Sequence, residues 1–220
     1  MEILNQLSSR KGDKTENSNK IVAEQCISNP RLLADIAAGC VETQGIASLQ
    51  SDCMEVFTLV AEKKPEFAVP YADNIVSLLS SKAAKTRWEA VHTLSFIAEK
   101  ISDDIFSILP MLQSLIENDR STIVRDYAID TVANYAKVSV ESSKESCELL
   151  KYALECWSEK HARQVFRGFN YVLDKCDDCK TEINSLVQPY LSANKKNVAA
   201  EAKKLLKRTE RQLFLRYDAG

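Results

Sequence analysis

The sequence contains few side chains of the types and spacings that support catalysis. Among its 220 residues there are two histidines, His92 and His161, and they lie far apart in the chain. The Gly-rich phosphate-binding loop, the serine nucleophile elbow (G-x-S-x-G) and the zinc-protease helix (H-E-x-x-H) are all absent. The sequence therefore predicts no catalytic residue, no metal site and no cofactor.

One cysteine spacing resembles that of a metal site, Cys176-Asp177-Asp178-Cys179. A structural zinc site needs about four ligands, and no second C-x-x-C or nearby His supplies the others. The two aspartates would also disfavour thiolates and so lower the reactivity of the thiols. We expect this segment to form a structural turn, and the other five cysteines to be small buried hydrophobic residues.

The cysteine count also bears on location. Seven is an odd number, and the first residues show neither a basic region nor the long apolar stretch of a signal peptide. Reduced thiols in the cytoplasm are the simplest expectation. The net charge of −2 argues against general binding to nucleic acid, and no apolar stretch is long enough to span a membrane.

Composition and periodicity together favour an all-α fold. Five Gly and five Pro are few for a chain of this length, whereas β-sandwiches and Rossmann folds need many turn residues. Paired apolar residues recur every 37 or 38 residues, at Leu78-Leu79, Leu115-Ile116, Ala153-Leu154 and Tyr190-Leu191. A period of this length with two helical patterns inside it predicts a right-handed α-solenoid.

We predict a single domain built of about five helix-pair repeats. Their predicted ranges are 30–63, 67–100, 104–138, 144–175 and 180–209. Residues 1–29 are expected to form an N-terminal helical extension with a frayed, polar start, and residues 210–220 a C-terminal tail.

The third repeat carries a specific pattern, in which Leu109-Pro110, Leu112, Leu115-Ile116 and Asp119 are followed by Val124-Arg125 and Ala128. This pattern resembles the consensus of the HEAT repeat family. The resemblance implies that an Asp and the Arg six residues later, here Asp119 and Arg125, form a hydrogen-bond ladder between repeats. The ladder is incomplete elsewhere, because Ser81 and Trp157 occupy the equivalent Asp positions.

The same resemblance implies that the second helix of each repeat lines a concave face. With about 3.6 residues per turn, the register places six side chains on the solvent side of these helices: Trp88, His92, Asp126, Asp130, Gln164 and Tyr171. Ala133 is expected to face solvent as well, and Gly168 to leave room for a partner side chain. The alternatives are that Trp88 lies in the core and that His92 is an ordinary surface residue.

Basic residues are concentrated near the C-terminus. Three of them, Lys204, Arg208 and Arg211, share one stripe of a predicted helix. Two interpretations stay open. The stripe is either the polar face of a terminal capping helix or a patch for an acidic partner, RNA or an anionic surface.

The leading functional hypothesis is a non-enzymatic scaffold that binds a protein or peptide on the concave face. One alternative is a HEAT-like DNA glycosylase that excises alkylated bases. Such enzymes use aromatic residues and an acidic residue, and the corresponding residues here would be Trp88, Asp126 and Tyr171. The six predicted site residues, however, include no Lys or Arg to neutralise phosphates. Another alternative is a chaperone or lyase-like subunit that grips a cofactor-bearing protein.

Overall fold

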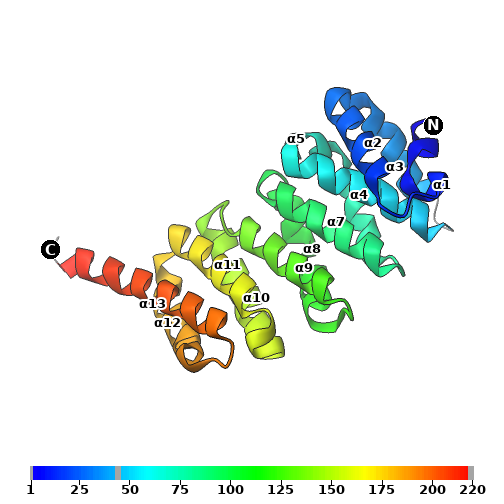
Figure 1. Cartoon of the computed structure of the whole chain (residues 1–220). Helices are drawn as coiled ribbons and strands as arrows, with labels where there is room; N and C mark the ends of the chain where they lie inside the picture. The colour runs from blue at the N-terminus through cyan, green and yellow to red at the C-terminus, as the bar shows by residue number, and fades with distance from the viewer. Residues whose placement is uncertain (1, 43–45, 218–220) are drawn as a thin grey trace.

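The protein is an all-α solenoid, as the sequence predicts. The structure, a computed structural model, describes residues 2–42 and 46–217, and the side chains of the last helix as far as residue 210. These residues contain helices and turns but no strand. Figure 1 shows the helices stacked in one row, so that the N-terminus and the C-terminus lie at opposite ends of the molecule.

The helices follow one another in pairs after a short N-terminal group. That group comprises η1 (Glu2–Gln6), α1 (Ser8–Lys11), α2 (Asn17–Ser28) and η2 (Pro30–Leu32). The first helices of the five pairs are α3 (Leu33–Glu42), the broken segment α5 (Pro65–Ala68), η3 (Val69–Tyr71), α6 (Ala72–Ser77) and η4 (Leu78–Ser80), then α8 (Ser102–Asn118), α10 (Val140–Trp157), and α12 (Lys180–Val187) with η8 (Gln188–Ser192). The second helices are α4 (Ala47–Lys63), α7 (Ala84–Ile97), α9 (Thr122–Tyr135), α11 (Ala162–Lys175) and α13 (Lys196–Tyr217), and short connections are η5 (Ala98–Lys100), η6 (Ser158–Lys160) and η7 (Asp177–Cys179).

The second helices form the inner layer of the stack. Helices α4, α7, α9 and α11 approach one another more closely than the first helices α6, α8 and α10 do. In a curved stack the more crowded layer lies on the inside, so the second helices line the concave face. A groove that crosses several repeats on this concave face is therefore built from α4, α7, α9, α11 and α13.

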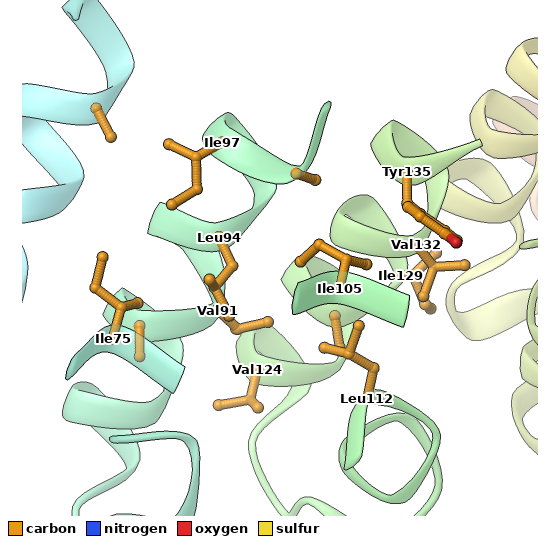
Figure 2. Close-up of a cluster of buried hydrophobic side chains, with 14 of the residues drawn as sticks. Ile75, Val91, Leu94, Ile97, Ile105, Leu112, Val124, Ile129, Val132 and Tyr135 are labelled. Atoms are coloured by element: carbon orange, nitrogen blue, oxygen red, sulfur yellow. The ribbon is translucent and has the colours of Figure 1, made fainter. Parts of the chain in front are cut away.

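One continuous hydrophobic core runs between the two layers. Its side chains repeat at helical spacing in every pair, so that each repeat buries its apolar stripe against the next. Figure 2 shows the centre of this core, where Ile105 and Leu112 of α8 lie with Val91 and Leu94 of α7. Among the described helices, none is both long and apolar enough to cross a bilayer.

The expectation of a frayed N-terminus is wrong. Residues 2–11 form η1 and α1, and Ile3, Leu4 and Leu7 are buried in the common core. The polar residues that suggested a loose segment make a buried network instead: Asn19 accepts from the Ser8 amide (2.9 Å) and donates to Asp52 on α4 (3.0 Å). A polar segment is stable inside a protein when its hydrogen bonds are satisfied in this way.

The C-terminal end is more regular than expected. The predicted tail over 210–220 begins inside α13, because that helix continues to Tyr217. The connections carry familiar N-terminal signals. Ser139 caps α10 through a reciprocal pair of hydrogen bonds with Ser142, and Ser121 caps α9 by accepting from the Val124 amide (3.4 Å).

Candidate functional site

The inner face has a cavity of about 180 Å³ that spans three repeats. Three of the predicted site residues, His92, Asp130 and Tyr171, line it together. They come from successive second helices, so the cavity depends on the stacking of the solenoid rather than on any one repeat. The complete lining is His92, Ser95 and Phe96 of α7, Tyr127, Asp130, Ala133 and Asn134 of α9, and Arg167 and Tyr171 of α11.

Aromatic rings form one wall of this cavity. His92 stacks on Tyr127, with ring centroids 3.7 Å apart and an angle of 12° between the planes. The centroid of the Phe96 ring lies 4.8 Å from that of His92, with the two planes tilted by 34°. Burial lowers the pKa of His92 to about 4, so the imidazole is neutral at pH 7 and acts as an aromatic surface rather than as a cation.

Carboxylates lie close to this aromatic wall. Burial raises the pKa of Tyr127, and the nearby carboxylates of Glu89, Asp130 and Asp126 raise it further. Burial also raises the pKa of Asp130, although the hydrogen bond that this carboxylate accepts from Arg167 opposes the shift. Burial disfavours charge of either sign, so the preference of this surface for a cation rests on its carboxylates, of which Asp130 lines the cavity.

The protein places its own cations on this surface. Arg167 pairs with Asp130 across the α9–α11 contact. The Lys137 ammonium lies 4.3 Å from the centre of the Tyr171 ring and also donates to Glu99 (3.0 Å). Both contacts are of the kind by which proteins hold basic side chains.

Trp88 does not line the cavity. It is half-buried and packs against the core, and its indole nitrogen donates to the Glu89 carboxylate at 2.5 Å. Glu89 itself is buried, and this burial raises its pKa. The prediction that Trp88 is the exposed centre of the groove is therefore wrong, because the side chain is partly buried against the core and lies outside the cavity lining.

Asp126 is also committed to an internal contact. His161 is buried between two repeats and its Nδ1 lies 2.6 Å from Asp126 Oδ1. Arg125 Nε donates to the other ring nitrogen, Nε2, at 3.1 Å. Since Nε2 accepts, Nδ1 carries the proton and donates to Asp126. The guanidinium of Arg125 lies 4.0 Å from the centre of the Trp157 ring. These contacts connect α9 to the turn between α10 and α11.

The ladder residues Asp119 and Arg125 connect repeats by different routes. The Asp119 carboxylate accepts two hydrogen bonds from Arg87 of the preceding repeat, one from Nε (2.6 Å) and one from Nη2 (3.0 Å). Arg125 does not contact this carboxylate and donates instead to the backbone carbonyl of Asp119. Asp119 also accepts from the Ser121 amide (2.8 Å), so it fixes the α8–α9 turn as well.

Gln164 lies at a second, adjoining cavity. This cavity has a volume of about 350 Å³ and lies between α11 and α13. Its lining contains two arginines, Arg163 and Arg167, with Gln164, Asn170 and Glu201. The expectation that the groove surface lacks basic residues is therefore wrong. The solvent-facing stripe of α11 is shifted by one residue and includes Arg163 and Arg167.

Two further expectations are wrong. Ala133 is buried rather than solvent-facing. Gly168 is buried too, and a Cβ placed there would lie 2.7 Å from Leu150 Cδ1 and 3.0 Å from Ala133 Cβ. Gly168 thus permits close packing of α11 against its neighbours and leaves no room for a partner. Sequence reasoning missed Phe96, Tyr127 and Arg167, although aromatic residues one position from the chosen stripe were a usable signal.

The C-terminal basic stripe is largely engaged within the protein. Arg208 donates to the Asn170 carbonyl (2.8 Å) and pairs with Asp174, both on α11. Lys204 pairs with Glu201 one turn away (2.8 Å). The side chain of Arg211 lies outside the described residues. The contacts of Arg208 favour the interpretation of α13 as a capping helix.

Six of the seven cysteines are buried, and Cys156 is only partly buried, contrary to expectation. Cys176 and Cys179 flank the α11–α12 turn, both are buried, and their sulfurs lie 3.0 Å apart. All seven cysteines are free thiols, and burial raises the pKa of Cys179. Within the described part of the chain, no group of three or more His, Cys, Asp or Glu residues has a geometry that could hold a metal ion. The cytoplasmic location stays a prediction.

Comparison with solved structures defines the class of fold. The chain is similar to the designed armadillo repeat protein YIII(Dq)4CqI, with a TM-score of 0.70, 16% identity, and coverage of 94% of this chain and 98% of that one. A second designed armadillo repeat protein, YIII(Dq.V1)4CPAF in complex with the peptide (KR)4, gives a TM-score of 0.67 at 16% identity over 94% and 97% of the two chains. Computationally designed armadillo repeat proteins for modular peptide recognition give 0.64 at 18% identity over 94% and 98%.

These similarities establish an armadillo-like helical repeat fold. By sequence, no family model and no curated protein matches the chain.

Proposed function

We propose that this protein is a non-enzymatic scaffold whose inner face binds an extended basic segment of another protein. The observation that carries the proposal is the cavity shared by α7, α9 and α11, with its aromatic wall and the Asp130 carboxylate. One Lys or Arg side chain of the partner would enter it. The aliphatic part would lie on the His92 and Tyr127 rings, and the charged end would reach Asp130.

The size of the cavity supports a side chain as its occupant. Pockets that hold small molecules usually measure about 300–1,000 Å³, and this one measures about 180 Å³. The rest of the partner would lie along the groove, over neighbouring repeats. The contact of Lys137 with Tyr171 shows what kind of cation contact this surface makes.

The solved structures support the same proposal. One neighbour is a designed armadillo repeat protein in complex with the basic peptide (KR)4, and another set was designed for modular peptide recognition. We infer further that the repeats are of the HEAT type, which the sequence of the third repeat resembles. The inter-repeat contact between Arg87 and Asp119 agrees with this assignment.

No specific observation favours an enzyme. A base-excising site built on Trp88, Asp126 and Tyr171 would need these residues to converge, and only Tyr171 lines the central cavity. Trp88 is bonded to Glu89, and Asp126 to His161. A chaperone or lyase-like subunit would also use a protein-binding surface, and it is included in the proposal as one kind of scaffold.

Fluorescence anisotropy with a labelled (KR)4 peptide tests the proposal. We expect binding that weakens as salt is added, because screening reduces charge attraction. Asp130→Asn is expected to weaken binding about tenfold, or about 1.4 kcal/mol. Tyr127→Leu, which keeps an apolar side chain but removes the aromatic face, is expected to act similarly.

Two variants on other surfaces serve as controls. Phe106→Ala alters an exposed apolar residue of α8, on the outer layer, and Asp178→Asn removes an exposed carboxylate. Neither is expected to change binding, and circular dichroism checks that all four variants keep their helix content. The proposal is wrong if the wild type fails to bind (KR)4 up to about 1 mM, or if the controls weaken binding as much as the cavity variants do.

A further inference from the structure

The cavity between α11 and α13 is lined by basic side chains, whereas the central cavity has aromatic rings and the Asp130 carboxylate in its lining. It is larger, at about 350 Å³, and two arginines of its lining, Arg163 and Arg167, lie one helical turn apart on α11. Amide side chains from Gln164 and Asn170 complete the same wall. The Asn170 amide is already engaged, because its nitrogen donates to the Phe166 carbonyl (2.9 Å) and its oxygen accepts from Arg208 (2.9 Å). The two guanidinium groups are donors only, so they suit an anionic group.

Arg163 is the uncompensated charge of this pocket. Its side chain is exposed, and the guanidinium makes neither an ion pair nor a hydrogen bond with any residue of the described chain. Glu201, the one carboxylate of the lining, is already paired with Lys204. The pocket therefore holds one cation with no partner and a second, Arg167, whose partner Asp130 belongs to the other cavity.

Arg167 separates the two cavities and lines both of them. Its side chain is 51% exposed, whereas that of Asp130 is 18% exposed. In the ion pair, the more exposed Arg167 side chain therefore lies on the solvent side of Asp130, between the two cavities. A long arginine side chain at this position can swing from the Asp130 side to the Arg163 side by rotation about its own bonds.

We propose that the α11–α13 pocket binds an anionic side chain of the same peptide, a carboxylate or a phosphate, and that ligand binding exchanges the Asp130–Arg167 ion pair. The basic side chain of the ligand takes the place of Arg167 at Asp130. The released Arg167 then joins Arg163 around the anionic group. This inference rests on the proposed function for the identity of the peptide, but the pocket itself can be tested without it.

The exchange of ion pairs makes the binding of the ligand's cation and the binding of its anion cooperative. A cation that binds alone must separate Arg167 from Asp130 and leave the guanidinium without a partner. An anion that binds alone either leaves Arg167 at Asp130 or leaves that partly buried carboxylate unpaired. When both bind, every charge has a partner, so each strengthens the binding of the other by the same factor.

Anion binding to the protein alone gives the first test. The Nε–H signals of Arg163 and Arg167 are followed by NMR while O-phosphoserine is added, with acetate as the carboxylate probe. Both signals are expected to shift. Asp130→Asn, which releases Arg167, is expected to tighten phosphoserine binding about tenfold while weakening binding of (KR)4. Arg163→Gln is expected to abolish the Arg167 response, and Lys203→Gln on α13 is the control for loss of one exposed cation.

A substitution scan of the peptide gives the second test. Each position of (KR)4 is replaced in turn by Glu or phosphoserine, and affinities are measured for the wild type, Arg163→Gln and Lys203→Gln. A surface that is uniformly acidic would bind every substituted peptide more weakly. We expect instead one position at which the anionic residue strengthens binding severalfold, with the gain lost in Arg163→Gln and kept in Lys203→Gln.

The two tests separate the two proposals. If (KR)4 binds but every substitution weakens it equally, the anion pocket is wrong and the proposed function stands. If phosphoserine binds with the expected response to Asp130→Asn but (KR)4 does not bind, the proposed function is wrong and the pocket stands. An anion affinity that Asp130→Asn leaves unchanged would overturn the exchange of the ion pair.

Discussion

Asp119→Ala should weaken the junction between the second and third helix pairs. The Asp119 side chain is 3% exposed, and it accepts two hydrogen bonds from an Arg87 side chain that is 17% exposed. Removing one partner of a buried charged pair typically costs about 3–5 kcal/mol. The lower end applies here, because Arg87 keeps the Ser81 carbonyl (2.7 Å) as a second acceptor. We expect a loss of about 3 kcal/mol, or about 6–12 °C in Tm for a chain of this size.

Urea denaturation followed by circular dichroism measures this loss. Asp178→Ala is the matched control, since its carboxylate is 82% exposed and its pairing with Lys144 should contribute less than about 1 kcal/mol. A double-mutant cycle with Arg87→Ala isolates the pair: the double variant should be little less stable than either single variant. Equal stability of Asp119→Ala and the wild type, or strictly additive effects of the two substitutions, would refute the reasoning.

The same pair predicts a pH dependence. Burial alone would raise the pKa of Asp119, but the hydrogen bonds from Arg87 and Ser121 outweigh it and the pKa lies below its usual value. A carboxyl with a depressed pKa stabilises the fold fully above its unfolded pKa of about 3.9 and loses this contribution as the pH falls through the folded value. The stability difference between wild type and Asp119→Asn should therefore shrink in acid, and a constant difference would contradict the ion pair.

Three further substitutions test other parts of the structure. Gly168→Ala should lower stability by about 1–3 kcal/mol, because its Cβ would lie 2.7 Å from Leu150 Cδ1; an unchanged thermal melt would show that α11 has room to spare. His161→Phe should cost about 1–3 kcal/mol in urea denaturation, since it leaves the buried Arg125 Nε without an acceptor; no loss would mean that this contact is dispensable. The wild type should lose stability as the pH falls from 6.5 to about 4, because His92 is protonated in the unfolded chain before it is protonated in the fold. Thermal melts of His92→Phe at several pH values should lack this part of the pH dependence. Identical pH profiles for the wild type and the variant would contradict the prediction.

The fold follows from the sequence because its signal is repeated. Apolar pairs such as Leu115-Ile116 recur at 37 or 38 residues, and only stacked helix pairs bury such a pattern repeatedly. The N-terminal segment escaped this reasoning because it is not a repeat. Its polar residue Asn19 looks like a solvent-exposed residue in the sequence, yet it is buried by hydrogen bonds to Ser8 and Asp52, which lie elsewhere in the chain.

The site was harder to predict than the fold. The helical register correctly grouped His92, Asp130 and Tyr171 on one surface, and the structure places all three at one cavity. A rotation of about one residue decides whether a side chain faces the groove or the core, and periodicity does not determine it to that accuracy. Trp88 was therefore assigned to the groove and Arg167 was omitted from it.

Photo-crosslinking tests the central claim most directly. A (KR)4 peptide with one position replaced by benzoylphenylalanine is irradiated with the protein, and the attachment sites are found by mass spectrometry. We expect adducts on α7, α9 and α11 at or beside His92, Tyr127 and Tyr171, and we expect them to be lost when unlabelled (KR)4 competes. Adducts concentrated on the outer helices α8 and α10, or adducts that unlabelled peptide does not displace, would contradict it.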